Sequence, residues 1–183
     1  MQVVDRNREV RTTAVLAVVC LVLQLALAPN IGLGNGRANF GLVLVGSVAL
    51  FSSSRHPVLA GFLSGLVFDL CTTGPIGLMA FCLTVTAFVL GLEGVGRGAG
   101  DLGSAMARFS VAAAAVSLVY HLAMLLTGAT SSFVDAVFLR ALPTTLLTVV
   151  AFVPFAYYLS RVRAASSGLG LSRRGSHLSG KGL

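Results

Sequence analysis

The segment Phe40–Cys71 most limits how this chain can fold, because its 32 residues are almost continuously apolar. As one α-helix it would be ~48 Å long, which exceeds the ~30 Å hydrocarbon core of a bilayer. The polar sequence Ser52–His56 divides the run, and Pro57 after it suits the first turn of a helix. We therefore predict two short helices, 40–51 and 57–71, which cross a membrane only if they tilt or the bilayer thins around them.

The composition of the whole chain places these helices in a bilayer rather than in a soluble core. Of 183 residues, 56% are hydrophobic and 10% are charged, whereas an ordinary soluble domain is ~25% charged. A small soluble domain has too much surface for so few polar residues to cover, but lipid solvates apolar surface. We predict an all-α fold, a polytopic integral membrane helical bundle that forms a single domain.

Four further apolar stretches bring the predicted bundle to six transmembrane helices. The first stretch resembles a signal peptide, but it is longer than the usual apolar region and a proline follows the possible cleavage site, so we interpret it as an uncleaved helix. A turn-rich loop separates it from the second helix. The four stretches are 12–28, 76–92, 105–127 and 134–160. The predicted organisation is a cytoplasmic N-terminus (1–11), a six-helix transmembrane domain (12–160) and a basic, disordered cytoplasmic tail (161–183).

The positions of the basic residues set the predicted orientation. The chain has 13 Lys and Arg against 6 Asp and Glu. With six helices and the N-terminus inside, eleven of the thirteen basic residues are cytoplasmic, while Arg37 lies outside and Arg140 lies within the last helix. Cytoplasmic segments of membrane proteins are usually enriched in Lys and Arg. We therefore predict that both termini are cytoplasmic, and that the basic charge serves orientation and anionic lipid rather than nucleic acid.

Motifs for catalysis or cofactor binding are weak. Gly98–Gly103 formally matches GxGxxG, but a dinucleotide site needs a preceding strand and a βαβ unit, so we interpret this segment as a flexible loop. Cys20, Cys71 and Cys82 show neither CxxC nor Cys/His spacing, and we interpret them as buried free thiols. We expect no catalytic constellation, metal site or cofactor.

Gly61 and Gly65 form a GxxxG pattern on the predicted helix 57–71. Small residues spaced by four allow two helices to approach closely and to gain van der Waals contact. The seam could lie inside the bundle or against a partner, and we favour the internal position.

Ionisable side chains inside the predicted helices are informative, because burying a charge in lipid costs at least ~2.5–3.5 kcal/mol. Asp69, His121 and Arg140, together with Gln24, all fall in the outer half of the predicted bundle. Asp135 precedes Arg140 by five residues, a spacing that turns it away from the same face of an α-helix. We therefore predict an ion pair between Asp69 and Arg140. In the alternative, each side chain reaches separately to the outer headgroups.

The stretch around Asp69 resembles the signature of the MreD family, the rod shape-determining membrane proteins of bacteria. That family typically carries a GLLxDLLxxxPLGLxAL pattern that joins two spans. Upstream, Arg37-Ala38-Asn39 stands where the family often has Arg-Pro-Asp, and the proline is missing here. The resemblance covers about residues 29–91. The matching positions are Gly65, Leu66, Asp69, Pro75, Gly77, Leu78 and Ala80.

The resemblance implies a non-enzymatic scaffold subunit of the elongasome, the machinery that lays peptidoglycan along the side wall and maintains rod shape. The implied partners are MreC and, directly or through MreC, the RodA polymerase and a class B penicillin-binding protein. The implied location is the bacterial cytoplasmic membrane. The implied fold is the six-helix design of the substrate-binding subunits of energy-coupling-factor transporters. The candidate structural and interaction residues are Asp69, Arg140, His121, Gln24, Gly61, Gly65, Pro75 and Gly77.

The alternative function is a small-molecule capture subunit of a vitamin-type transporter. It would use the four polar side chains of the outer half as a ligand pocket. Such pockets depend on aromatic side chains, and the chain has no Trp and three Tyr, of which Tyr157 and Tyr158 fall at the inner end of the last helix. An integral membrane enzyme is disfavoured, because paired acids and metal ligands at usable spacing are missing.

Overall fold

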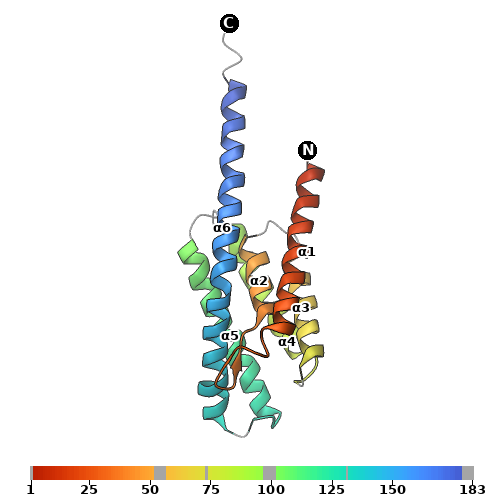
Figure 1. Ribbon diagram of the computed structural model, residues 1–183, viewed down its shortest axis with the longest axis vertical. Coiled ribbons are helices and arrows are strands. Elements are labelled where there is room, and N and C mark those ends of the chain that lie inside the picture. Colours follow the sequence, from red (N-terminus) through yellow and green to blue (C-terminus); the bar gives the residue numbers. More distant parts are fainter. Residues whose placement is uncertain (1, 52–56, 73, 97–101, 131, 179–183) are drawn as a thin grey trace.

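The computed structural model describes residues 2–51, 57–72, 74–96, 102–130 and 132–178, with side chains described only within 10–92 and 102–162. Across these residues every regular element except one small hairpin is a helix, so the predicted all-α class is confirmed (Figure 1). The elements in chain order are α1 (Gln2–Ala26), β1 (Gly32–Leu33), β2 (Gly36–Arg37), α2 (Phe40–Phe51), α3 (Pro57–Cys71), α4 (Leu78–Gly96), α5 (Leu102–Leu126), the π-helix η1 (Asp135–Ala141) and α6 (Leu142–Leu178).

The two short helices begin and end where the sequence predicts. The break between them, 52–56, lies outside the described residues, as does most of the GxGxxG loop, 97–101. α4 begins two residues later than predicted, because Gly77 has a φ of +97° and therefore cannot belong to a right-handed helix. The last predicted helix, 134–160, is divided into η1 and α6.

α2 is the central helix of the bundle. It packs against α1, α3, α4 and α6, and ten of its twelve residues are buried. The rings of Phe109 on α5 and Phe152 on α6 stack with centroids 3.7 Å apart, and both lie against Gly46 of α2, which has no side chain to displace them. A helix without charge is thus enclosed by the other five, as its uniformly apolar sequence requires.

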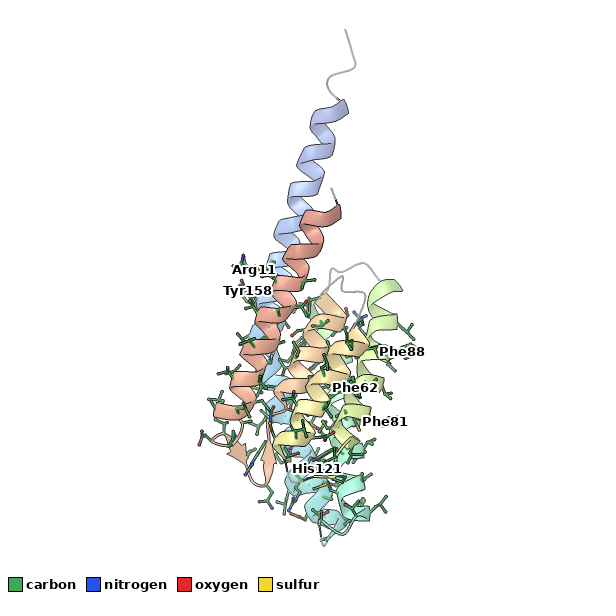
Figure 2. All side chains as sticks on the ribbon, turned by 90° about the vertical axis from the view of Figure 1, so that its right-hand side faces the viewer. Arg11, Phe62, Phe81, Phe88, His121 and Tyr158 are labelled. Carbon is green, nitrogen blue, oxygen red and sulfur yellow. The ribbon has the colours of Figure 1, made fainter. Side chains whose placement is uncertain are left out.

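The helices differ in how well they match the thickness of a membrane. α5 and the continuous segment Asp135–Val162 are long and apolar enough to cross a bilayer. The other apolar helical segments are shorter, and a complete crossing by each of them stays a prediction. Large apolar side chains are exposed on the outside of the bundle, among them Phe62 of α3 and Phe81 and Phe88 of α4 (Figure 2). Exposed apolar surface on this scale suits a lipid environment.

The N- and C-terminal helices extend from the same end of the bundle (Figure 1). We call the opposite end, formed by the hairpin Gly32–Arg37, the turn 74–77 and the loop 127–130, the distal end. α6 continues to Leu178 and thus through most of the basic segment for which composition predicts disorder. The chain has no proline after Pro154, so no proline stops the helix within the basic segment.

Candidate functional site: polar groups at the distal end

Asp69 is the most deeply buried ionisable side chain at the distal end, with a relative exposure of 1%. Its carboxylate accepts hydrogen bonds from the backbone N–H groups of Gly77 at 2.9 Å, Met79 at 3.1 Å and Ala80 at 3.0 Å. The first N–H groups of an α-helix have no partner within the helix and carry partial positive charge. Asp69, near the end of α3, therefore caps α4 across the turn that joins them.

The glycines around Asp69 make this cap possible. A Cβ at Gly65 would stand 2.7 Å from the amide nitrogen of Ala80, and one at Gly61 would stand 2.6 Å from the carbonyl oxygen of Leu83. Both distances are too short for a side chain, so the GxxxG pair brings α3 against the backbone of α4. The seam is internal, and the close approach positions the Asp69 carboxylate over the N-terminus of α4.

The turn between α3 and α4 is also fixed from α5. The carbonyl of Pro75 accepts the N–H of Leu78 at 3.3 Å. A Cβ at Gly74 would stand 2.5 Å from the hydroxyl oxygen of Tyr120 on α5. Tyr120 also makes an edge-on ring contact with Phe68, with centroids 6.1 Å apart. The family-like motif thus lies at a corner where three helices pack together.

The buried N-terminus of α2 is capped by two side chains. The Asn39 side-chain oxygen accepts the N–H of Leu42 at 3.0 Å, which is the usual bond of an N-cap asparagine. The side-chain oxygen of Gln24, on α1, accepts the N–H of Phe40 at 2.8 Å. The Asn39 amide also donates to the sulfur of Met79 at 3.5 Å. Gln24 and Asn39 therefore anchor the central helix to α1 and α4.

Two buried threonines of α6 hold the strand that leads into α2. The Thr144 hydroxyl accepts the backbone N–H of Arg37 at 3.2 Å, and the Thr148 hydroxyl accepts that of Asn39 at 3.0 Å. Thr148 in turn donates to the carbonyl of Thr144 at 2.6 Å. The segment Arg37-Ala38-Asn39 is therefore bound to α6 through its backbone. These two bonds do not require the proline that the family often carries in this segment.

Arg140 is paired with Asp135, at 2.9 Å, and not with Asp69, so the predicted Asp69–Arg140 pair is wrong. The prediction assumed α-helical geometry, in which residues five apart diverge. Asp135 and Arg140 lie instead in η1, where hydrogen bonds join residues i and i+5 and therefore bring these two onto one face. Asp69 needs no cation, because three backbone N–H groups already satisfy it.

His121 is half-buried on α5, and its Nδ1 lies 2.8 Å from the carbonyl oxygen of Ser117. Among the described residues no hydrogen bond or ion pair joins any two of Gln24, Asp69, His121 and Arg140. Each has its own partner inside the bundle. Gln24, Asp69 and His121 bond to backbone groups and Arg140 bonds to Asp135, and a ligand pocket shared by the four side chains stays a prediction.

The remaining question for the site is whether its polar side chains and cysteines could bind a metal or react. Within the residues that the structure describes, no three His, Cys, Asp or Glu side chains gather as metal ligands do. Cys20 and Cys82 are buried as expected, but Cys71 is exposed, because it ends α3 at the distal turn. The polar groups of the distal end join helices to one another, so the arrangement fixes the shape of this end of the bundle.

Several residues of the distal end were not anticipated from the sequence, although some left a signal. Asn39 stands immediately before an apolar run, as N-cap residues do. Gly34 and Asn35 form a two-residue hairpin turn in which Gly34 has a φ of +60°, as a type II′ turn requires. Thr144 and Thr148 left no comparable signal, because threonine in an apolar helix usually bonds only to its own backbone.

Comparison with known proteins agrees with the motif around Asp69. The family model for rod shape-determining protein MreD matches residues 6–162 of the 183-residue chain. No curated protein and no solved structure matches the chain. The match includes both strands and all or part of every helix, well beyond the motif itself, and the chain therefore belongs to the MreD family of bacterial rod shape-determining membrane proteins.

Proposed function

We propose that the chain is a non-enzymatic scaffold subunit of the cell-wall elongation machinery, which binds MreC and through it RodA and a class B penicillin-binding protein. Family membership over residues 6–162 carries this proposal, since it places the chain among proteins that determine rod shape. The distal end supports a scaffold role, because its buried polar side chains join helices to one another. A protein of this kind acts through the surfaces that its fixed shape presents.

We further propose six spans with both termini in the cytoplasm, in a fold like that of the capture subunits of energy-coupling-factor transporters. The common position of the two termini supports an even number of crossings (Figure 1). Tyr157 and Tyr158 are 52% and 66% exposed, and Arg161 donates to the Tyr157 hydroxyl at 2.7 Å. Exposed tyrosine beside arginine is typical of a membrane–water interface. Arg11 of α1 lies near Tyr158 along the long axis of the bundle (Figure 2), which marks the proposed cytoplasmic headgroup level and the place for anionic lipid.

Native and introduced thiols test this orientation. Cys71 is exposed at the distal end, whereas Cys20 and Cys82 are buried. A membrane-impermeant maleimide applied outside cells with a permeable outer layer should label Cys71. It should label Tyr158→Cys, in a Cys71→Ser background, only after the inner membrane is opened. Labelling of Tyr158→Cys in sealed cells would contradict the proposed topology.

Partner binding is tested by affinity purification of the tagged full-length chain from membranes of its own bacterium. MreC should co-purify at a fixed ratio, and RodA and the penicillin-binding protein should be lost when MreC is depleted. An unrelated polytopic membrane protein with the same tag is the control. Recovery of no more MreC than in the control would contradict the proposed function.

A further inference from the structure

The π-helix η1 (Asp135–Ala141) lies directly before α6 and is an uncommon backbone state. π-helical turns are rare and occur frequently at functional sites. The seven residues Asp-Ala-Val-Phe-Leu-Arg-Ala include neither glycine nor proline and are compatible with an ordinary α-helix. The π geometry is therefore favoured from outside the segment, by Pro143, whose ring disfavours α geometry at Leu139, and by tertiary contacts.

One such contact follows from Pro143. In an α-helix the carbonyl of Leu139 would accept the N–H of residue 143, but proline has none. The backbone N–H of Asn35, at the tip of the hairpin, fills that place at 3.1 Å. Within η1, the N–H of Leu142 reaches the carbonyl of Val137, five residues back. The hairpin thus supplies the donor that the helix cannot supply itself.

The side chains at the hairpin tip add two further contacts. The Asn35 amide donates to one oxygen of Asp135 at 3.3 Å, and Arg140 donates to the other at 2.9 Å. Gly36 lies so close to the junction of η1 and α6 that a Cβ there would stand 2.9 Å from the carbonyl oxygen of Arg140 and 2.7 Å from the amide nitrogen of Thr144. In α geometry, residues 135 and 140 would be about 140° apart around the helix, and the ion pair would be lost.

We propose that the hairpin Gly32–Arg37 is a latch that holds η1 in the π state, and that its release lets residues 135–141 become α-helical. Removing one π turn rotates the preceding residues by about 100° relative to α6. Phe133 and Val134, which are 59% and 58% exposed, would then face a different direction. The latch therefore determines which apolar surface the distal end presents, a conformational control that goes beyond the scaffold role.

Distance measurement between two spin labels tests the latch on the full-length protein in lipid nanodiscs. The labels are placed at Phe133→Cys and at Val111→Cys on α5, after Cys20, Cys71 and Cys82 are replaced by serine. Gly36→Ala should displace the hairpin from η1, and Pro143→Ala should give Leu139 an internal donor while leaving the hairpin sequence intact. Gly32→Ala is the control, since its Cβ would meet only the Gly36 carbonyl oxygen, at 3.3 Å.

If the hairpin is a latch, the distance between the two labels should show one population in the parent and in Gly32→Ala. A second population should appear in both Gly36→Ala and Pro143→Ala. If Gly36→Ala does not fold, Asn35→Ala, which removes the bond to Asp135, takes its place. An unchanged distance in Pro143→Ala would overturn the proposal that residues 135–141 change between a π-helical and an α-helical state. A second population in Pro143→Ala together with an unchanged distance in the hairpin variant would overturn the hairpin as its latch.

Discussion

The carboxylate of Asp69 lies 3.0 Å from the backbone nitrogen of Ala80, across the turn that joins α3 to α4. That bond and its two companions place the buried carboxylate on the N-terminus of α4 rather than beside a cation. The most distinctive residue of the family-like motif is thus a helix cap. Its role explains why the motif combines an acid with closely spaced glycines.

Removing the Asp69 carboxylate should destabilise the protein strongly. Asp69→Ala leaves up to three N–H groups without an acceptor, two of them buried, and each buried group costs about 1–3 kcal/mol. Thermal unfolding in detergent should show a large loss for Asp69→Ala and a smaller one for Asp69→Asn, which keeps one oxygen acceptor. Asp135→Asn is the control, because that ion pair is partly exposed and pairs of this kind contribute about 0–1 kcal/mol. Equal losses in Asp69→Ala and Asp135→Asn would contradict the capping role.

Charge exchange distinguishes the observed ion pair from the predicted one. The double variant Asp135→Arg/Arg140→Asp should recover part of the stability lost in each single variant, since both side chains stay on one face of η1. The double variant Asp69→Arg/Arg140→Asp should recover nothing. A double-mutant cycle on unfolding temperatures measures both couplings, and a positive coupling in the second pair would contradict the structure.

Enlarging the seam glycines should separate α3 from α4. Gly65→Leu and Gly61→Leu place side chains into backbone that a Cβ alone would already crowd. Overpacking a buried contact costs about 1–3 kcal/mol and often more where backbone must move. The fraction of monodisperse protein in size-exclusion chromatography should fall in both. Leu63→Ala on the same helix is the control, because Leu63 is exposed; the same loss there would indicate that α3 is merely intolerant of change.

The hydroxyl of Thr148 should be needed at a buried position. Thr148→Val keeps the shape of the side chain but leaves the N–H of Asn39 without its acceptor, at a cost of about 1–3 kcal/mol. Thr148→Ser keeps the hydroxyl and should lose less. Hydrogen exchange at the Asn39 amide gives a direct measure, with faster exchange expected only in the valine variant. Unchanged protection in that variant would show that Thr148 does not hold the segment before α2.

The sequence predicted the parts of the fold that depend on local patterns. The start of the apolar run at Phe40, its polar break at Ser52–His56 and Pro57 after the break marked α2 and α3 to the residue. Gly61 and Gly65 marked an internal seam on α3, because close helix packing needs small residues regardless of the rest of the fold, but they did not identify α4 as the partner helix. The GPIGL segment after Asp69 placed the chain in the right family.

The pairing of polar groups could not be predicted in the same way, because it depends on backbone geometry that the pattern does not record. The spacing of Asp135 and Arg140 argues against a pair in an α-helix and for one in a π-helix. Pro143 was the only local sign of the difference, since it removes the donor for Leu139. Likewise, Asp69 was expected to need a cation, but backbone N–H groups of α4 serve instead once the turn brings them close.

The role in rod shape is tested most directly by measuring the length-to-width ratio of cells depleted of this protein in its own bacterium. Cells should become round as the protein is lost. The wild-type gene should restore rods, while Asp69→Ala, produced at equal membrane level, should restore them poorly. Cells that keep their normal length-to-width ratio after full depletion would contradict the proposed role in rod shape.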